Sequence, residues 1–458
     1  MLEQIAFILL FLAGMTLFAL RIRKIRRNIN LGRDIDLSDQ PAKRWKTMAM
    51  VALGQSKMVT RPVAGILHIL VYAGFIIVNI EVLEIILDGI TGKHRIFAGL
   101  GGLYDVLIGS FEVLAFGVLV SCVIFLIRRN ILNIKRFHSK EMTKWPKSDA
   151  NIILVIEILL MFAFLSMNAC DALLQSALET AIANGEVISD TLAHYSKAGS
   201  FPVSSLLTGL YSGFDVESLV FIERSMWWFH IVGILCFLVY VPYSKHFHIF
   251  LAFPNTYYSN LNPKGTLSNM EAVTKEVQLM MDPNVDPFAT PAPSEGEPSV
   301  PETFGAKDAT DLTWKQLMEA YSCTECGRCT SECPANQTGK LLSPRKVMMD
   351  TRDRIEEIGL NIDKNGEFKD DGKLLIGDYI SEEELWACTT CNACAEACPI
   401  NINPLAIIID LRRYLIMEQS KSPESITAMF NNIENNGAPW AFPASDRGKW
   451  AEEMDSSN

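Results

Sequence analysis

Five long apolar stretches dominate the first half of the chain. They cover approximately residues 2–20, 62–87, 103–127, 150–170 and 218–243, with polar segments between them. The hydrocarbon core of a bilayer, about 30 Å thick, is crossed by about 20 mostly apolar residues in a helix. Each stretch is long enough, or nearly so, to span that core. The pattern therefore predicts a transmembrane bundle of five helices over residues 1–250.

The second half of the chain has shorter elements with a mixed pattern. Residues 251–310 are expected to form a linker, because 283–301 are rich in Pro, Ser, Glu and Gly, a composition that extends and does not pack. Further on, Ser343 and Pro344 are typical of a helix start, and an amphipathic helix begins at Pro404. We expect a small α-helical domain at 311–420 and a C-terminal tail at 421–458.

Charge placement indicates how these parts are oriented. The chain is 49% hydrophobic, which agrees with membrane segments, and its formal net charge of -11 argues against nucleic-acid binding. Eleven Lys and Arg residues lie in 21–61 and seven in 128–147, against two in 88–102 and one in 172–217. Because short cytoplasmic loops are enriched in Lys and Arg, this distribution predicts an N-terminus outside and a cytoplasmic location for everything after residue 244.

Eight of the eleven cysteines form two blocks with the same spacing. Each block reads C-x2-C-x2-C-x3-C-P, the run typical of ferredoxins with two [4Fe-4S] clusters. In such runs the first three thiolates hold one cluster and the fourth ligates the other. We therefore expect one cluster on Cys323, Cys326, Cys329 and Cys398, and a second on Cys388, Cys391, Cys394 and Cys333. A pair of zinc sites is the alternative, but structural zinc usually takes cysteine pairs separated by longer loops.

Cysteines that bind metal need a reducing compartment, so the two blocks independently predict a cytoplasmic location for residues past 300. The other three cysteines lie singly in apolar stretches and are expected to be small core residues. The predicted fold class is therefore mainly α, with a five-helix transmembrane bundle followed by a cytoplasmic α-helical dicluster ferredoxin-like domain.

Histidines are scarce, with seven in the chain, so those near the apolar stretches stand out. His68 and His248 both lie near the predicted cytoplasmic side, whereas His230 is in the middle of the fifth stretch. A haem b that bridges two helices needs one imidazole on each side of the iron at a similar depth. Eighteen residues of helix put His230 about 27 Å from His248, so we expect His68 and His248 to be the haem ligands. The alternative is that His68 packs unliganded and that His246 and His248 are ordinary interfacial side chains.

Carboxylates inside the predicted spans are costly and usually mark proton or substrate paths. A quinone changes its protonation with its redox state, and its head group needs acids, bases and hydrogen-bond donors. The expected quinone site is formed by Asn79, Glu81, Glu84 and His230. An equally weighted alternative is that these groups are structural and pair with Arg224 and with one another.

The histidine-bearing segments resemble a known family. The stretch HIVGILCFLVYVPYSKHFH, from His230 to His248, is similar to the last helix of the respiratory nitrate reductase gamma subunit and its relatives, in which two histidines at this spacing ligate two b haems. RPVAGILHILVYAGF around His68 resembles that family's second helix, but the histidine expected ten residues later is Val78 here. The resemblance implies one haem, held by His68 and His248, and leaves a second haem open.

The part from about Asp311 to the end is similar to the C-subunit of heterodisulfide reductase. It also resembles the iron-sulfur segments of glycolate oxidase and of the membrane protein that links electron-transfer flavoprotein to quinone. In such fusions, a segment like residues 431–454 leads into a module with CCG-type cysteine motifs. The resemblance implies that a separate CCG-domain protein, similar to the B-subunit of heterodisulfide reductase, docks near the C-terminus. It also implies a location in the bacterial cytoplasmic membrane.

We therefore expect a membrane-bound electron-transfer subunit of a quinone-linked oxidoreductase complex. Electrons would pass from electron-transfer flavoprotein or another flavin dehydrogenase, directly or through the CCG-domain partner, across two clusters and a haem b to menaquinone or ubiquinone. The motifs do not set the direction, and the resemblance favours quinone reduction. Two other classes stay open: a quinol-oxidising subunit of a heterodisulfide-reductase-like or sulfur-metabolism complex, and a non-catalytic redox-sensing membrane anchor.

Overall fold

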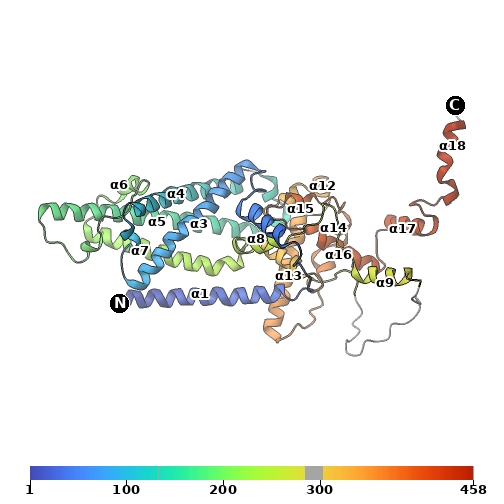
Figure 1. Cartoon of the computed structure of the whole chain (residues 1–458), viewed down its shortest axis with the longest axis horizontal. Coiled ribbons are helices and arrows are strands. Elements are labelled where there is room, and N and C mark those ends of the chain that lie inside the picture. The colour runs from blue at the N-terminus through green and yellow to red at the C-terminus, as the bar shows by residue number, and fades with distance from the viewer. Residues whose placement is uncertain (133, 284–302, 457–458) are drawn as a thin grey trace.

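A computed structural model of the protein describes residues 1–132, 134–283 and 303–456. Five helices in these ranges are long and apolar enough to cross a membrane (Figure 1). They are α1 (Leu2–Ile29), α3 (Pro62–Thr91), α4 (Gly102–Asn130), α5 (Trp145–Asn184) and α7 (Val216–Tyr240). The mainly helical fold class with five membrane-length helices, predicted from the sequence, is confirmed.

The long helices run further than the apolar stretches that predict them. α1 continues through its basic end to Ile29 instead of ending at residue 20, and α5 continues to Asn184 instead of 170. The extra turns of α5 bury Asp171 and Leu174, and the helix ends at Gly185, whose φ is 71°. Hydropathy locates the spans but not their ends, because polar residues continue a helix wherever another part of the chain covers them.

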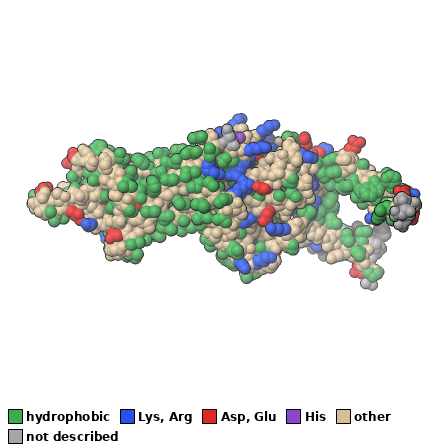
Figure 2. Space-filling view, turned by 90° about the horizontal axis from the view of Figure 1, so that it is seen from above, with side chains coloured by type: hydrophobic (Ala, Val, Ile, Leu, Met, Phe, Trp, Pro, Cys, Tyr) green, Lys and Arg blue, Asp and Glu red, His purple; other side chains and the backbone are tan. Residues whose placement is uncertain are grey.

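Close packing holds the long helices together. α5 packs against both α4 and α7, α3 packs on α4, and α1 packs on α7. A Cβ atom at Gly74 would lie 2.5 Å from Val118, and one at Gly117 would lie 2.4 Å from Leu70. These two glycines therefore let α3 and α4 approach closely, as small residues do in membrane helices. Hydrophobic side chains cover the outside of the bundle, and Lys and Arg gather where it meets the C-terminal part (Figure 2).

Shorter helices follow or separate the long ones. In the first 283 residues these are α2 (Pro41–Met48), the π-helix η1 (Ala49–Leu53), η2 (Ile96–Leu100), η3 (Lys135–Phe137), η4 (Lys140–Met142), η5 (Leu192–His194), η6 (Ser204–Leu206), α6 (Thr208–Tyr211), η7 (Val241–Tyr243), η8 (Lys245–Phe247), α8 (His248–Tyr257) and α9 (Glu271–Met281). The region 251–310 was expected to be a linker, yet it contains most of α8 and all of α9. α8 belongs to the packed structure, since buried Asn255 donates a hydrogen bond of 2.7 Å to the carbonyl of Ile400. Most of the proline-rich stretch lies outside the described residues.

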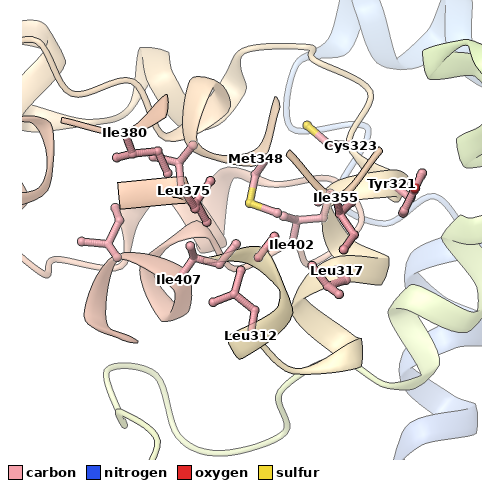
Figure 3. Packing of buried hydrophobic residues seen from close by; sticks show 14 of the residues in the cluster. Leu312, Leu317, Tyr321, Cys323, Met348, Ile355, Leu375, Ile380, Ile402 and Ile407 are labelled. Carbon is pink, nitrogen blue, oxygen red and sulfur yellow. The ribbon is translucent and has the colours of Figure 1, made fainter. Parts of the chain in front are cut away.

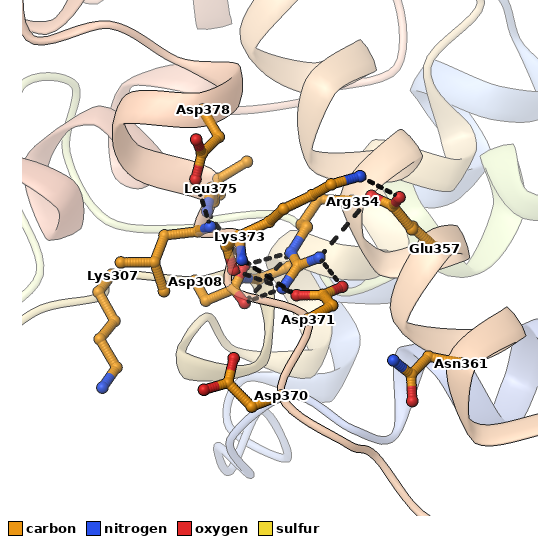
Figure 4. Close-up of polar contacts among 12 residues, drawn as sticks. Lys307, Asp308, Arg354, Glu357, Asn361, Asp370, Asp371, Lys373, Leu375 and Asp378 are labelled. Atoms are coloured by element: carbon orange, nitrogen blue, oxygen red, sulfur yellow. Dashed lines mark hydrogen bonds and ion pairs between the residues drawn. The ribbon is translucent and has the colours of Figure 1, made fainter. Parts of the chain in front are cut away.

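The C-terminal part consists of short helices around one long one. Its elements are η9 (Ala309–Asp311), α10 (Trp314–Ser322), α11 (Arg328–Ser331), α12 (Pro334–Gln337), α13 (Pro344–Asn365), η10 (Leu375–Tyr379), α14 (Glu382–Trp386), α15 (Ala393–Ala397), α16 (Pro404–Met417), α17 (Glu424–Asn436), η11 (Ala444–Gly448) and α18 (Lys449–Ser456). Leu317, Met348, Ile355 and Ile407 belong to its buried core (Figure 3). A network around Arg354 joins Asp308 to the loop that follows α13 (Figure 4).

One hydrophobic core joins the C-terminal part to the bundle. Ile25, Phe237 and Phe247 of the bundle side belong to the same buried cluster as Leu317 and Ile355. We call this end of the bundle the near end, and the opposite end, where α3 finishes and α7 begins, the far end. Polar contacts reinforce the junction, because the α1 residue Arg21 pairs with Glu356 of α13 at 2.9 Å and Asn28 donates to the Tyr321 hydroxyl at 2.9 Å. The two parts therefore meet through a packed interface.

Candidate functional site

The two cysteine blocks fold into loops with the same backbone pattern. The first loop begins directly after α10 and has a positive φ at Glu325 (54°) and Gly327 (70°). The second has a positive φ at Thr390 (55°) and Asn392 (62°), at the same offsets from its first cysteine. Alternating right- and left-handed residues turn successive N–H groups to one side and form a concave nest for an anion. The two cysteine blocks therefore share their backbone conformation as well as their spacing.

The loops cross so that the fourth cysteine of one block meets the other block. We name the first thiol set (Cys323, Cys326, Cys329, Cys398) and the second thiol set (Cys333, Cys388, Cys391, Cys394). The first thiol set lines a single cavity that Arg345, Met348 and Ile402 help to close. Cys333 is close enough to Cys388 and Cys394 to interact with both electrostatically. Nowhere in the described ranges do three His, Cys, Asp or Glu side chains converge on the position of one single metal ion.

The two thiol sets differ in burial. Each set has two buried thiols, Cys323 and Cys398 in the first and Cys333 and Cys394 in the second, but the other two thiols of the first set are half-buried, whereas Cys391 of the second is exposed. Burial raises the pKa of Cys323 and of Cys394 to about 12 and that of Cys398 to about 11. Such thiols stay neutral until a metal deprotonates them, and binding then supplies the charge compensation that burial denies. The first thiol set is thus a protected site that fits an iron-sulfur cluster, and the second opens to the surface.

Two histidine rings face each other at the near end. His68 on α3 and His248, the first residue of α8, have ring centroids 6.4 Å apart with planes tilted by 41°. An iron with axial imidazoles at metal–nitrogen distances of about 2.0 Å would hold the ring centres about 6 Å apart. The Nδ1–H of His248 donates to the carbonyl of Lys245 at 3.0 Å, which leaves Nε2 free to ligate. The Nδ1 of His68 is buried without a partner. The pair therefore fits bis-histidine ligation of a haem.

His248 reaches this position because the fifth span does not continue as one helix. α7 ends at Tyr240, and two 3-10 turns follow, with Pro242 in the first and an extended Ser244 between them. The sequence estimate of about 27 Å between His230 and His248 assumed an unbroken helix and does not apply to this path. The Ser244 hydroxyl accepts from the His246 N–H at 3.0 Å and stabilises the turn.

The histidine pair and the first thiol set are joined by direct contacts. Lys245, whose carbonyl holds His248, forms an ion pair with Glu325 inside the first cysteine loop. Glu325 also pairs with Arg352 at 2.8 Å, and together these cations lower the pKa of its carboxyl although burial opposes them. On the other side of the pair, Arg328 of the same cysteine loop donates to the segment that precedes α3. The cysteine loop and both histidines are thus held in one rigid junction.

The four residues expected to form the quinone site are not brought together equally. Glu84 is buried and accepts from the Tyr104 hydroxyl and the Phe97 N–H, both at 2.8 Å. Glu81 is buried and its Oε2 has no partner. Asn79 is exposed on the surface of α3, and its amide bonds to its own helix at Phe75. His230 is buried, and its Nδ1 bonds to the carbonyl of Leu160 at 2.9 Å. Glu81 and Glu84 therefore share a region, while Asn79 faces away from it.

A network at the far end was not predicted from the sequence. Arg95, 7% exposed, donates to Asp171 at 2.6 Å, to Asn168 at 2.8 Å and to the Tyr104 hydroxyl at 3.1 Å. Asn168 in turn donates to Glu112 at 3.1 Å. The available signal was that Arg95 is one of two basic residues in the short loop 88–102, beside carboxylates at the helix ends. Through Tyr104 and Asn168 the network includes Glu84 and Glu112, two of the carboxylates inside the predicted spans.

A cavity of about 340 Å³ also opens at the far end, bordered by Phe7, Asp88, His94, Tyr195, Arg224 and Trp227. It is far from the histidine pair. From His68 to Asp88, twenty residues of α3 cover about 30 Å. The cavity is therefore separate from the site formed by the histidines and thiols.

Known proteins match the cysteine loops and, more distantly, the whole chain. A family profile described as a 4Fe-4S dicluster domain matches residues 322–402. The chain is 26% identical over 466 residues to the probable iron-sulfur-binding oxidoreductase FadF of Bacillus subtilis, covering 95% of this chain and 59% of that protein. It is 25% identical over 446 residues to the EtfAB:quinone oxidoreductase of Syntrophomonas wolfei, covering 92% of this chain and 55% of that protein.

The C-terminal part has shorter matches as well. It is 32% identical over 108 residues to the C-subunit of the ferredoxin/F420H2-dependent CoB-CoM heterodisulfide reductase of Methanosarcina acetivorans, covering 23% of this chain and 53% of that protein. The chain spans a little over half the length of the two longer relatives. No solved structure matches. The chain therefore carries a 4Fe-4S dicluster domain together with the helices of a multi-pass membrane protein, and it is similar to iron-sulfur oxidoreductases.

Proposed function

We propose that the protein is a membrane-bound electron-transfer subunit that links a cytosolic donor to the quinone pool. The observation that carries the proposal is the junction at the near end. There the first thiol set and the pair of His68 and His248 are held together through Lys245 and Glu325. When bound, two [4Fe-4S] clusters and a haem b supply carriers for one electron at a time. The chain supplies their order and their spacing.

The two thiol sets differ in exposure, and this difference indicates which set lies at each end of the electron path. The second thiol set includes the exposed Cys391, so it is the accessible point for a soluble donor. The first thiol set has no exposed member, and its loop adjoins the histidine pair through Glu325 and Lys245. The resemblance to the nitrate reductase gamma subunit adds that such histidines ligate b haems, and we propose one haem here. Val78 stands where a second ligand is expected, and it is buried among apolar side chains.

The quinone site is proposed among the polar groups of the bundle. Of the four residues named from the sequence, Glu81 keeps a buried oxygen without a partner, and His230 keeps Nε2 because Nδ1 is used. These two groups are the best suited to exchange protons with a quinone head group. Glu84 and Asn79 already have hydrogen bonds within the bundle, so we give them supporting roles. The quinone is menaquinone or ubiquinone.

The donor and the partner are proposed from the relatives and from the exposed tail. One relative is called EtfAB:quinone oxidoreductase, so we propose electron-transfer flavoprotein or another flavin dehydrogenase as donor. α17 and α18 extend from the C-terminal domain (Figure 1) and carry exposed Phe430 and Trp450, with Trp440 and Phe442 between them. We propose this tail, 421–458, as the docking region for a CCG-domain protein. The proposed location is the bacterial cytoplasmic membrane, with the N-terminus outside and the thiol sets in the cytoplasm.

A second candidate function is the reverse reaction in a heterodisulfide-reductase-like complex. The match of the C-terminal part to the C-subunit of a heterodisulfide reductase favours it. There the chain would oxidise a quinol and deliver electrons to a partner that reduces a disulfide. A redox-sensing anchor without quinone turnover is the third class.

Stopped-flow spectroscopy of the purified protein distinguishes these functions. The protein is reduced under argon with a limiting amount of dithionite and mixed with a short-chain menaquinone or ubiquinone analogue. We expect reoxidation of the haem band and of the iron-sulfur EPR signals. If quinone leaves them reduced while the corresponding quinol reduces the oxidised protein, the chain works in the reverse direction. If neither compound changes them, the electron-transfer proposal fails.

A further inference from the structure

We infer that three cations without a carboxylate partner, Lys57, Arg136 and Arg328, bias the site of the first thiol set toward accepting an electron from the site of the second thiol set. This inference rests on the proposed function, since it takes both thiol sets as iron-sulfur sites. It adds the direction in which an electron settles within the domain, which the cysteine spacing leaves open.

Arg328 and Lys57 lie on one side of the first thiol set. Together with Arg136 they form what we call the charged surround of this set. Arg328 lies between the second and third cysteines of its block, is 5% exposed, and donates to the carbonyls of Lys57 at 3.0 Å and Met58 at 3.3 Å. Neither side chain has an ion pair within the described parts of the chain. Among the groups around Arg328, the thiol that attracts it most strongly is Cys326. Arg328 also donates to the Thr60 hydroxyl at 3.4 Å and to the Met58 sulfur at 3.1 Å, so its charge is held beside the first thiol set by uncharged acceptors.

Lys57 reaches the same site from the segment before α3. Its Nζ donates to Asn401 Oδ1 at 3.0 Å and to the carbonyl of Ala395 at 3.4 Å. Both acceptors flank Cys398, which is the thiol that attracts Lys57 most strongly. A neutral amide and a carbonyl orient this ammonium. Glu396 also attracts it, but Glu396 forms its ion pair with Lys264 at 2.9 Å and not with Lys57.

Arg136 closes the surround from the loop between α4 and α5. Its Cβ lies 3.4 Å from the place that a Cβ of Gly327 would occupy, so the loop packs directly on the first cysteine loop. The guanidinium lies over Phe137 at 4.8 Å, and its Nε is buried with no hydrogen-bond partner. The residue as a whole is half-buried, and burial together with the neighbouring Arg61 lowers the pKa of Arg136 to about 10. A cation that is partly removed from water without an anion is costly. An anionic cluster on the first thiol set would provide the missing counter-charge.

Other cations near the first thiol set do not add to this imbalance. Arg345 pairs with Glu141 at 2.7 Å, and Arg352 and Lys245 both pair with Glu325. Arg352 also pairs with Asp353 at 3.1 Å and Lys245 lies 3.9 Å from Asp149, so each of these cations has a carboxylate nearby. Arg129 has no ion pair within the described parts of the chain, but the groups that attract it are Glu325 and Asp149 and not a thiol. The imbalance at the thiols therefore comes from Lys57, Arg136 and Arg328.

The second thiol set lacks an equivalent surround. Its cation is Arg412, which donates to the carbonyls of Cys388 at 2.6 Å and Leu385 at 3.0 Å and lies 5.0 Å from the Trp386 ring centre. Cys391 is exposed, so water screens charges there. Burial alone would make the first site the harder one to reduce. Three unpaired cations in a region of lower dielectric act in the opposite sense and outweigh it, since charge interactions strengthen as water is excluded.

The step that this arrangement favours is a transfer of one electron. The second site, reduced by a flavin-type donor, is oxidised by one electron, and the first site is reduced by one. No bond forms or breaks and no proton moves. The charge placement thus favours flow from the protein surface toward the membrane.

An EPR-monitored redox titration of the anaerobic full-length protein tests this inference. Arg136→Gln and Lys57→Gln remove one charge each, Arg136→Lys and Lys57→Arg keep it, and Arg412→Gln is the matched change at the second thiol set. In the unchanged protein we expect two midpoint potentials. Arg136→Gln and Lys57→Gln should shift the same EPR signal. That signal should be the one with the higher midpoint potential. Its midpoint potential should fall by at least 59 mV, which for a one-electron couple corresponds to a tenfold change in the equilibrium constant.

Each outcome decides the inference. It stands if the Lys and Arg replacements leave that midpoint in place and if Arg412→Gln lowers the other midpoint instead. It is overturned if the signal that moves is the lower one, or if charge-keeping and charge-removing variants move it equally. It is equally overturned if none of the variants at the first set moves either midpoint. A protein without two cluster signals would instead refute the proposed function, so the two failures are distinguishable.

Discussion

The two ends of the helix bundle both bury polar groups, but they satisfy them differently. At the far end, buried Arg95 and Asp171 have partners in each other and in the hydroxyl and amide groups around them. At the near end, the Nδ1 of His68 and the Nε of Arg136 are buried with no partner. An unsatisfied buried polar group is costly, so a closed set of groups stabilises a fold, whereas an open set indicates that something binds there. The hydroxyls of Ser166 and Ser204, towards the far end, are also buried without a partner, so the contrast between the two ends is one of degree. It supports the proposal that cofactors bind at the near end.

The largest expected effect concerns the open end. Cys398→Ser removes from the first thiol set the one ligand that comes from the other block, and we expect loss of that cluster and of about half of the bound iron. The haem absorbance should remain, because His68 and His248 are untouched. Iron and sulfide analysis with EPR measures the loss. Cys391→Ser is the control and should cost the other cluster. If Cys398→Ser removed only the signal that Cys391→Ser also removes, the crossed ligand sets would be wrong.

Disrupting the network at the far end should destabilise the fold without loss of bound cofactors. Arg95→Met removes the arginine partner of the fully buried Asp171 and leaves it only His94, whose Nε2 lies 3.3 Å away, so we expect a loss of about 3–5 kcal/mol in the free energy of unfolding. Arg224→Met is the matched control, because that side chain is 36% exposed and its partner Glu223 keeps a hydrogen bond from Tyr195. Chemical unfolding in detergent gives both values. Equal losses in the two variants, or a changed haem spectrum in folded Arg95→Met, would mean that the far end is not a purely structural network.

Glu81 is the ionisable exception at the far end and sharpens the comparison. It lies beside the closed network, yet its Oε2 is buried without a partner. Glu81→Gln should slow reoxidation of the reduced protein by a quinone analogue by about a hundredfold, the low end of what a positioned proton donor contributes. Asn79→Ala, on the exposed face of the same helix, removes a group with only a supporting role and should slow that rate much less than Glu81→Gln does. Stopped-flow traces compare the two. A slow Asn79→Ala combined with a normal Glu81→Gln would reverse the assignment.

The sequence was most informative where chemistry depends on spacing. Two repeats of the same cysteine run predicted which thiols belong together, and the structure brings Cys398 to the cavity of the first block. The match of residues 322–402 to a dicluster domain agrees. The pairing of His68 with His248 was inferred from depth alone, and the rings lie 6.4 Å apart. Spacing and depth are properties that a sequence carries directly.

It was least informative where tertiary contacts decide. The last turns of α5 contain polar residues, and only the contacts of Asp171 and Gln175 with other segments explain why the helix continues to Asn184. Arg95 resembles an ordinary loop residue until its partners on α5 are known. α8 was predicted to be part of a linker, because its role depends on packing against the C-terminal domain. Such features can be recognised only when the tertiary structure shows which distant segments are in contact.

The visible absorption spectrum of His68→Ala, measured beside His230→Ala, tests the central claim most directly. Both changes remove a histidine from the bundle, but only His68 faces His248 across the near end. The account predicts that His68→Ala loses the b-type haem band and keeps both iron-sulfur EPR signals, while His230→Ala keeps the band. A normal band in His68→Ala would contradict the claim that this histidine pair holds a haem next to the first thiol set.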